Sequence, residues 1–254
     1  MEGVRVVELN HEILEGKGSF CLRSKKQSQG YINKNKWLND RFEEGLKYVQ
    51  LFEGKKPVGF IEYTEAEYSS RVVHADHYLV IHCLWVSATG KGYGKKLINH
   101  CLEEARHQNK AGVVVVTNSE TSWTPSRDTF LKSGFQVVDT APFGFELLVY
   151  HIHDDALSPY FPSNWEERLK SFDQLTIVRS FQCPYIDIAT QNVLEGAEKL
   201  GLEVDIIDLK NREELMRISP TPYGIYSVIY KGELIAFHRL TVHSVFKRLK
   251  GLLQ

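Results

Sequence analysis

The chain has 254 residues, and its 31 Lys and Arg residues nearly balance its 32 Asp and Glu residues, for a formal net charge of -1. This balance excludes a global electrostatic field that would draw the protein to nucleic acid, to an anionic membrane or to a strongly acidic partner. The length is high for one domain and favours two, and every apolar run is far shorter than the roughly 18 residues of a membrane span.

Cysteine and histidine usage points to a reduced compartment without a metal. Cysteines stand at positions 21, 83, 101 and 183 without C-x-x-C spacing, and the chain opens Met-Glu-Gly-Val with no apolar signal segment. We therefore expect a cytoplasmic protein. His74-x-x-His77 and His151-x-His153 lack Cys or acidic partners at ligand spacing, so we interpret them as surface histidines and predict no metal site.

The N-terminal third alternates strand patterns with polar segments. Apolar and β-branched runs flanking Glu53-Gly54-Lys55-Lys56-Pro57 are typical of a hairpin with a short loop. The predicted elements are a strand at 4–9, a polar loop containing Gly16 and Gly18, one or two short helices within 31–46, and hairpin strands at 48–52 and 58–63.

The most informative stretch runs from residue 78 to residue 117. Residues 78–86 are aromatic and β-branched, as in a buried strand, and residues 87–96 pack three glycines and three lysines into a turn. The following apolar residues Ile98, Cys101, Leu102 and Ala105 have the spacing of one helical stripe, and 113–117 is a second apolar strand. The glycines therefore stand where a strand leads into a helix N-terminus.

Such a junction favours an anionic ligand. Glycine allows close backbone approach, and the first NH groups of a helix lack partners within the helix and lie at its positive dipole end. Lys91, Lys95 and Lys96 add positive charge, which favours a polyphosphate. The Walker pattern and the G-x-G-x-x-G dinucleotide pattern are both missing from this stretch.

The segment Thr89-Gly90-Lys91-Gly92-Tyr93-Gly94 resembles the R/Q-x-x-G-x-G/A signature of the GCN5-related N-acetyltransferases (GNAT), with Thr89 in place of the usual Arg or Gln. The order of strand, loop, helix, strand and a helix ending in Gly134-Phe135 also fits that family. The resemblance implies a mixed-sheet α/β acyl-CoA acyltransferase fold and transfer of an acetyl group from acetyl-CoA to an amine by direct attack. It also implies that the cofactor-binding residues are Leu84, Trp85, Val86, Thr89, Gly90, Lys91, Gly92, Tyr93, Gly94 and Lys95.

For the catalytic groups we consider His82 and Glu62. His82 has the strand parity of Val80, Leu84 and Val86, and its ordinary pKa near 6.5 suits a proton acceptor. Cys83 has the opposite parity and should then pack beneath the strand. The family's acid is a tyrosine, which Phe130 replaces here, and we expect Tyr93 to act through its backbone alone.

The rest of the first half predicts a helix at 126–133 and strands at 135–139 and 145–150, followed by a polar linker. We therefore divide the chain into an acetyltransferase domain at 1–150, a linker at 151–170 and an accessory domain at 171–254. In the accessory domain we expect strands at 175–181, 202–209, 226–230 and 234–240, with helices at 183–200 and 212–218.

This second half resembles a small thioredoxin/glutaredoxin-like α/β domain of the YoaP-like type. Cys183-Pro184-Tyr185 is similar to the start of the glutaredoxin C-P-Y-C motif, and Thr221-Pro222 is similar to that fold's Thr-Pro segment with a cis proline. Ile186 stands in place of the second cysteine, so dithiol exchange within this domain is excluded. A helix N-terminus could still lower the pKa of Cys183.

Three functions remain open at this point. The first is N-acetyl transfer to a small-molecule or peptide amine. The second is a non-catalytic CoA sensor whose C-terminal domain recognises a protein partner. The third is a thiol protein that acts through Cys183 alone. The sequence does not identify the acceptor amine or the oligomeric state.

Overall fold

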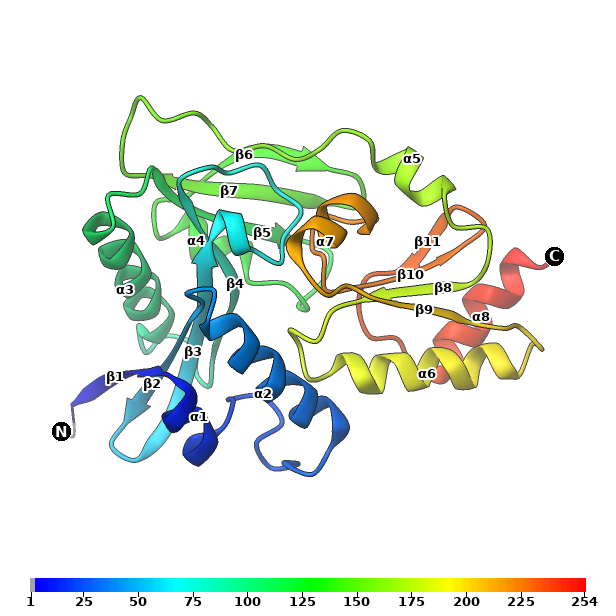
Figure 1. Ribbon diagram of the computed structural model, residues 1–254, viewed down its shortest axis with the longest axis horizontal. Coiled ribbons are helices and arrows are strands. Elements are labelled where there is room, and N and C mark those ends of the chain that lie inside the picture. The colour runs from blue at the N-terminus through cyan, green and yellow to red at the C-terminus, as the bar shows by residue number, and fades with distance from the viewer. Residues whose placement is uncertain (1–2) are drawn as a thin grey trace.

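The computed structural model describes residues 3–254 and contains two β-sheets side by side (Figure 1). The larger sheet has seven strands in the order β1-β2-β3-β4-β5-β7-β6, and only the β4–β5 pair is parallel. Its strands are β1 (Val4–Leu9), β2 (Lys47–Glu53), β3 (Lys56–Glu65), β4 (Tyr78–Val86), β5 (Gly112–Asn118), β6 (Gln136–Ala141) and β7 (Phe145–His151).

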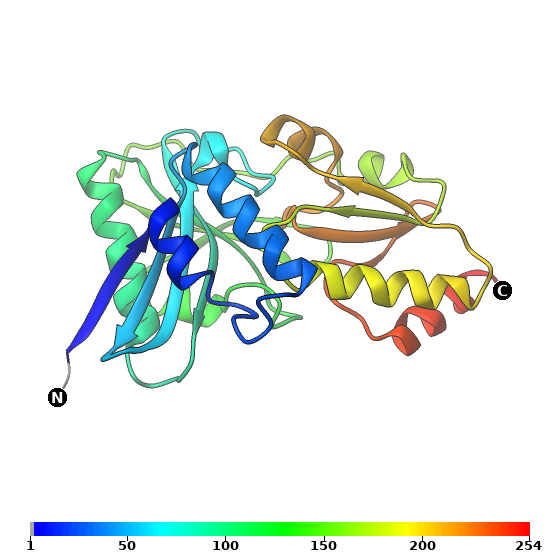
Figure 2. The same ribbon diagram turned by 60° about the horizontal axis from the view of Figure 1, so that its bottom comes forward.

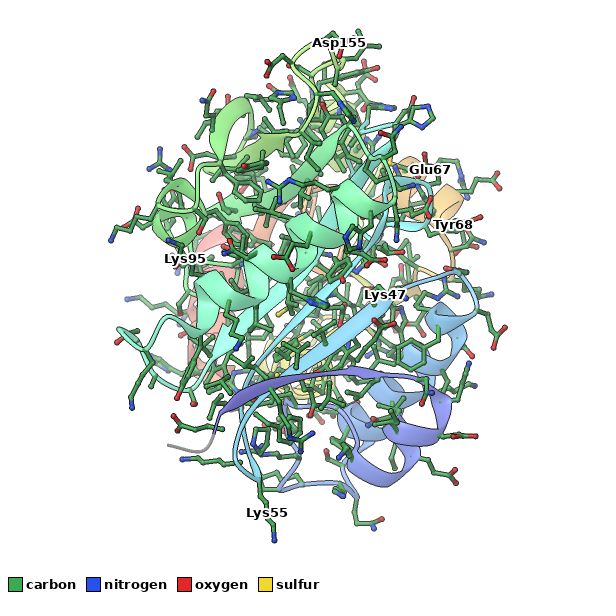
Figure 3. The ribbon with its side chains drawn as sticks, turned by 90° about the vertical axis from the view of Figure 1, so that its left-hand side faces the viewer. Lys47, Lys55, Glu67, Tyr68, Lys95 and Asp155 are labelled. Atoms are coloured by element: carbon green, nitrogen blue, oxygen red, sulfur yellow. The ribbon has the colours of Figure 1, made fainter. Side chains whose placement is uncertain are left out.

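Helices cover both faces of this sheet. They are α1 (His11–Lys17), α2 (Gln29–Phe42), α3 (Tyr93–His107) and α4 (Arg127–Leu131), with a short 3-10 helix η1 (Ala66–Tyr68) before β4. The apolar stripe of α3 packs on one face with Ile81 and Val115, and Figure 3 shows this helix in front of the strands with Lys95 at the molecular edge. Leu38 of α2 and Phe60 share a cluster on the other face.

The loop predicted after the first strand is partly wrong, because α1 occupies its beginning. The Asn10 side chain accepts a hydrogen bond of 2.9 Å from the backbone NH of Ile13, which caps the helix. Leu14 is the buried residue that attaches α1 to the sheet. The helix is short and contains Gly16, a poor helix former, so the sequence pattern gave little signal for it.

The smaller sheet has four strands in the order β11-β10-β8-β9, with β8 and β9 parallel and the other pairs antiparallel. The strands are β8 (Thr176–Arg179), β9 (Asp205–Asp208), β10 (Tyr226–Tyr230) and β11 (Glu233–Ala236). The helices are α5 (Trp165–Lys170), α6 (Ile186–Glu198), α7 (Arg212–Ile218) and α8 (Val242–Leu252). α6 and α8 lie together on one side of the sheet (Figure 2).

Two expectations for this half need correction. The segment 151–170 contains α5, whose Trp165 and Leu169 are buried, so its second part is packed rather than an open linker. Within residues 3–254 every peptide bond is trans, so a cis Pro222 is wrong. Its carbonyl accepts a hydrogen bond of 3.0 Å from the backbone NH of Val72 in the larger half.

The two halves share one apolar core. Val114 and Leu147 of the large sheet belong to the same buried cluster as Ile177 and Tyr226 of the small sheet. In addition, the Arg212 guanidinium on α7 donates hydrogen bonds of 2.8 to 3.0 Å to three carbonyl groups of the segment before β4, those of Ser69, Arg71 and Val73. The smaller half is therefore fixed against one face of the large sheet, over strands β4, β5 and β7.

Candidate active site between the two halves

The strands β4 and β5 separate toward their carboxyl ends. They pair only from Tyr78 to Ile81 on β4, and the remainder of β4 pairs with β3 alone. The backbone NH of Ser87 donates to the carbonyl of Val58 at 2.8 Å, which fixes the alternation of the antiparallel ladder. In that alternation Leu84 and Val86 direct their NH and C=O groups into the gap between β4 and β5.

The backbone groups of Trp85 point the other way. Trp85 is opposite Phe60 in a hydrogen-bonded pair, so its NH and C=O groups face β3. Its side chain is 47% exposed and lines the cavity described below. Of the three β4 residues expected along a cofactor, two thus offer free main-chain groups and the third offers a side chain.

The glycine-rich turn lies at the surface, between the end of β4 and the start of α3. Gly90 and Gly92 have φ angles of 76° and 73°, in the left-handed region that favours glycine, and an added Cβ at either would meet open space. Lys91 and Lys95 are exposed beside them, while the Tyr93 side chain is 5% exposed and packs in the cluster beneath α3. The predicted strand, turn and helix are confirmed.

A β-bulge changes which side chains of β4 share a face. The register shifts at Glu62, so that Cys83 is opposite Glu62, Ile81 is opposite Tyr63, and His82 is the extra residue. Beyond the bulge Leu84 packs on the α3 side, while Cys83 faces the cavity. The expectation that His82 shares a face with Leu84 and Val86 is therefore wrong, as is the burial of Cys83 beneath the strand.

A buried arginine satisfies the backbone at this bulge. Arg71 is fully buried, and its guanidinium donates to the carbonyl of His82 and, at 2.8 Å, to the amide oxygen of Gln182. The group also lies 4.4 Å from the centre of the Tyr223 ring. Arg71 thus connects the irregular part of β4 to two residues of the smaller half.

Both halves enclose a cavity of about 360 Å³ beside β3 and β4. The larger half contributes Ser19, Cys21, Lys34, Tyr48, Phe60, Glu62, Cys83, Trp85, Ser122 and Trp123. The smaller half contributes Gln182, Cys183, Pro184, Tyr185, Tyr223, Ile225 and Arg239. The cavity is therefore complete only when the two halves are docked.

Glu62 is the carboxylate of this cavity. It is 1% exposed, its Oε2 lies 2.5 Å from the Lys34 ammonium, and its Oε1 accepts a hydrogen bond of 2.8 Å from the Gln182 amide. Burial alone would raise the pKa of Glu62, but the Lys34 ammonium and the neighbouring His82 lower it from 4.5 to about 2. Glu62 is ionised at neutral pH.

His82 lies behind Glu62 and outside the cavity lining. It is fully buried, its Nε2 accepts a hydrogen bond of 2.9 Å from the backbone NH of Ser70, and its Nδ1 lies 3.3 Å from Glu62 Oε1. Because Nε2 is an acceptor, the neutral ring carries its proton on Nδ1, toward the carboxylate. Burial lowers the pKa of His82 from 6.5 to about 4, so the ring is neutral at pH 7.

Three thiols from distant parts of the chain line the cavity: Cys21, Cys83 and Cys183. Burial raises the pKa of Cys21 to about 12, that of Cys183 to about 11, and that of Cys83 well above its ordinary value. The possible lowering of the Cys183 pKa by a helix terminus is therefore contradicted. All three groups are protonated thiols at neutral pH, which disfavours a nucleophilic role.

Sequence analysis did not find several residues of this cavity. Lys34 lies in a helix among other charged residues, and nothing in its spacing distinguishes it from a solvated lysine. Gln182 and Arg239 are single polar residues without a motif. Tyr185 belongs to the Cys-Pro-Tyr segment that we identified, but its contribution to the wall of a site in the other half is a tertiary feature.

The residue at the position of the family's tyrosine and the hydroxyl of Tyr150 both lie apart from the cavity lining. Phe130, at the position of the family's tyrosine, is fully buried, and the Tyr150 hydroxyl accepts a hydrogen bond of 3.2 Å from Arg106 on the outer side of α3. Across residues 3–254, no cluster of three or more His, Cys, Asp or Glu side chains has the arrangement of a metal site. In the same range, every helix is too short or too polar to cross a bilayer.

Comparison with known proteins gives a family match to the larger half and one relative that matches nearly the whole chain. Residues 13–135 match the model of the acetyltransferase (GNAT) family. The chain is 28% identical over 250 residues to the N-acetyltransferase YoaP of Bacillus subtilis (strain 168), itself described as uncharacterized, and the match covers 97% of this chain and 98% of that protein. The predicted mixed-sheet acetyltransferase fold of the first half is thereby confirmed.

Solved structures give matches to the same half. A GNAT-family acetyltransferase of Staphylococcus aureus Mu50 has a TM-score of 0.45 and 14% identity, covering 59% of this chain and 100% of its own. The PaiA N-acetyltransferase of Thermoplasma acidophilum in complex with coenzyme A has a TM-score of 0.43 and 16% identity, covering 59% and 99%. YncA of Salmonella typhimurium with acetyl-CoA has a TM-score of 0.42 and 15% identity, covering 61% and 96%.

Proposed function

We propose that this protein, whose residues 13–135 match the model of the acetyltransferase (GNAT) family, transfers the acetyl group of acetyl-CoA directly to an amine bound between its two halves. The observation that carries the proposal is the meeting of two features at β4. Free main-chain groups and an exposed glycine turn lie along its outer end, and a cavity with an ionised carboxylate lies beside it.

The cofactor is proposed to lie along β4 and the turn. The pyrophosphate would bind the main-chain NH groups between Gly90 and Lys95, where the helix dipole and the lysines favour an anion. The pantetheine would pair with Leu84 and Val86 in the gap that β5 leaves open. This placement uses main-chain groups, so Thr89 in place of the family's Arg or Gln removes only a side-chain contact.

The chemistry requires a neutral amine, a proton acceptor and a donor for the oxyanion. A backbone NH near Val86 would bind the developing oxyanion of the thioester. Glu62 is proposed to receive the amine proton, because it is the ionised carboxylate of the cavity. His82 is proposed as its positioning residue, since its Nδ1 faces the carboxylate and its ring does not line the cavity.

The departing CoA thiolate is proposed to take its proton from water. The family's tyrosine is replaced by Phe130, which has no hydroxyl and is fully buried. Thr129 and Ser126 lie in the same segment but do not line the cavity. No covalent enzyme intermediate is needed, because the amine attacks the thioester carbonyl itself.

The domain assignment completes the proposal. Residues 1–150 would form the catalytic domain, and residues 171–254 a thioredoxin-like accessory domain, which the strand order and directions of the small sheet support. Four free cysteines fit a reducing cytoplasm as the location. The face carrying Cys183 and Pro222 already docks on the first half, so a protein partner would need another surface of this domain.

Two measurements on the full chain test the proposal. Isothermal titration calorimetry should detect binding of acetyl-CoA, and release of free CoA thiol should accelerate when members of an amine panel are added. Binding without turnover across the panel would favour the non-catalytic sensor. Failure to bind acetyl-CoA would overturn the placement at Gly90 to Lys95 together with the transferase function.

A further inference from the structure

The side chains that line the cavity include more positive than negative charges. Lys34 and Arg239 are cationic and Glu62 is anionic, while the cysteines and tyrosines are neutral at pH 7. Lys34 and Glu62 form a buried pair at the inner wall. The cavity therefore has an excess of one positive charge, and that charge belongs to the arginine of the smaller half.

Arg239 is available for a ligand. Its residue is exposed, and it forms no salt bridge with any acidic group of residues 3–254. Its guanidinium lies 5.9 Å from the centre of the Tyr185 ring, which orients it at the wall of the cavity. A planar guanidinium held on an aromatic ring is well suited to bind a carboxylate through two hydrogen bonds.

The shape and lining restrict the acceptor further. A volume of about 360 Å³ is small among ligand pockets, which commonly span about 300 to 1,000 Å³. The lining is rich in aromatic side chains, with Phe60, Trp85 and Trp123 from one half and Tyr223 from the other. Such walls favour a compact molecule with a flat or apolar middle over a lysine side chain on a protein surface.

We propose that the acceptor is a small amine that carries one carboxylate, with its amine at Glu62 and its carboxylate at Arg239. This rests on the proposed acetyl transfer. The form that attacks a thioester is the neutral amine, so a molecule with a neutral amine and one carboxylate has a charge of -1, which complements the excess positive charge of the cavity. The C-terminal domain thus selects the acceptor.

The reaction balances without another reagent. The amine nitrogen forms a bond to the acetyl carbonyl carbon, the C–S bond of the thioester breaks, and the sulfur leaves with its electron pair as the CoA thiolate. The amine proton passes to the Glu62 carboxylate and from there to solvent. The product is an N-acetylated carboxylate, which has lost the basic amine.

Matched amine pairs test this inference. Tyrosine against tyramine and histidine against histamine differ by one carboxylate, and kcat/KM is measured for each with saturating acetyl-CoA. The wild type should prefer the carboxylate member at least tenfold, or about 1.4 kcal/mol. Arg239→Gln should abolish that preference through a higher KM for the carboxylate member, while the member without a carboxylate keeps its kcat/KM. Arg217→Gln, which changes an exposed arginine on α7, is the control and should behave like the wild type.

The possible failures are distinguishable. Preference of the wild type for the amines without a carboxylate, or an equal loss for both members in Arg239→Gln, would overturn the role of Arg239 and leave acetyl transfer standing. If neither pair nor any other amine of the panel is acetylated although acetyl-CoA binds, the proposed function fails as well.

Discussion

The proposed cofactor side and acceptor side of this site are built in different ways. The cofactor side runs continuously from Leu84 to Lys95, lies at the surface and offers mainly backbone groups. The acceptor side is a buried cavity whose lining comes from positions between Ser19 and Arg239, and it offers side chains. The first depends on local conformation, whereas the second depends on how two sheets dock.

This difference affects which changes each side tolerates. Main-chain NH groups at a strand-to-helix junction remain in place when neighbouring side chains change, because glycine conformations and helix geometry position them. The cavity instead holds Glu62 through Lys34 and Gln182, one from each half. A change that shifts the halves should therefore affect the acceptor side first.

The largest expected effect on ligand binding is on the cofactor side. Gly92→Asp places a carboxylate beside the proposed pyrophosphate, at a left-handed position that Asp tolerates better than most residues. Charge repulsion should weaken acetyl-CoA binding by about a hundredfold, or about 2.7 kcal/mol, as measured by calorimetry.

Gly92→Asn is the matched control, with nearly the same shape and no charge. It should bind acetyl-CoA much more tightly than Gly92→Asp does. Equal binding by the two variants, or wild-type affinity in Gly92→Asp, would contradict a pyrophosphate at this turn.

The same contrast explains what could be predicted from the sequence. The glycine turn and the helix after it are local patterns, so the strand, turn and helix over residues 84–95 were predicted correctly. The bulge at His82 is not local, because it depends on the register of β3 against β4 and on Arg71, which binds the freed carbonyl. The alternation of side chains along one strand therefore predicted the wrong face for Cys83.

The contribution of the second half to the cavity was also beyond the sequence pattern. Cys183-Pro184-Tyr185 resembles a redox motif, so the sequence pattern indicated a role for the thiol. It did not indicate that Gln182 and Tyr185 line a cavity. The docking that brings these residues to Glu62 depends on the shared apolar core and on Arg212, whose bonds connect positions more than a hundred residues apart.

The second prediction concerns acid, which should weaken the acceptor side. His82 has a lower pKa in the folded protein than its ordinary 6.5, so the unfolded chain binds more protons between pH 6.5 and about 4. The free energy of unfolding should therefore fall as pH falls through that window, by on the order of 3 kcal/mol. The pKa of Glu62 is about 2 in the folded protein, below its ordinary 4.5, so the free energy of unfolding should fall further as the pH falls below 4.5.

Urea denaturation between pH 7 and pH 4 measures this slope. His82→Gln should flatten it, whereas His243→Gln, at an exposed position on α8, should keep the slope of the wild type. A His82→Gln variant with an unchanged slope would show that this buried ring is not the source of the acid sensitivity.

The third prediction concerns a substitution at the contact between the two halves. Gly30 lies in the first turn of α2, which meets the start of α6 (Figure 2), and an added Cβ would lie 2.1 Å from the Pro184 carbonyl oxygen. Gly30→Ala should cost about 1 to 3 kcal/mol of stability and should raise KM for the acceptor, while acetyl-CoA affinity is unchanged.

Gly16→Ala is the matched control for helix propensity. Gly16 also lies in a helix, and nothing in residues 3–254 lies within 4 Å of a Cβ added there. This variant should be neutral or slightly stabilised, by up to about 1 kcal/mol. If Gly30→Ala behaves like Gly16→Ala in stability and in acceptor KM, the close contact between α2 and Pro184 contributes neither to stability nor to acceptor binding.

The fourth prediction separates the thiol from the cavity that it lines. Cys183→Ser should keep kcat within a few-fold of the wild type, because the protonated thiol has no proposed chemical role. Alkylation of any of the three cavity thiols by iodoacetamide, which is slow because they are protonated at neutral pH, should instead block acetyl transfer, since the adduct would occupy the cavity. Alkylation alone therefore cannot identify a thiol enzyme, and loss of activity in Cys183→Ser is the result that would support one.

The smallest effect is expected for the hydroxyl of Tyr93, on the cofactor side. Tyr93 is the first residue of α3, beside the glycine turn. Its side chain is 5% exposed and packs with the apolar residues beneath the helix. Tyr93→Phe keeps that packing and the backbone NH, so acetyl-CoA affinity and kcat should stay nearly unchanged. Tyr93→Ala should lower the stability by about 3 to 5 kcal/mol through the lost packing. A hundredfold slower reaction in Tyr93→Phe at unchanged stability would mean that the Tyr93 hydroxyl contributes to the reaction, in addition to the backbone groups of the cofactor side.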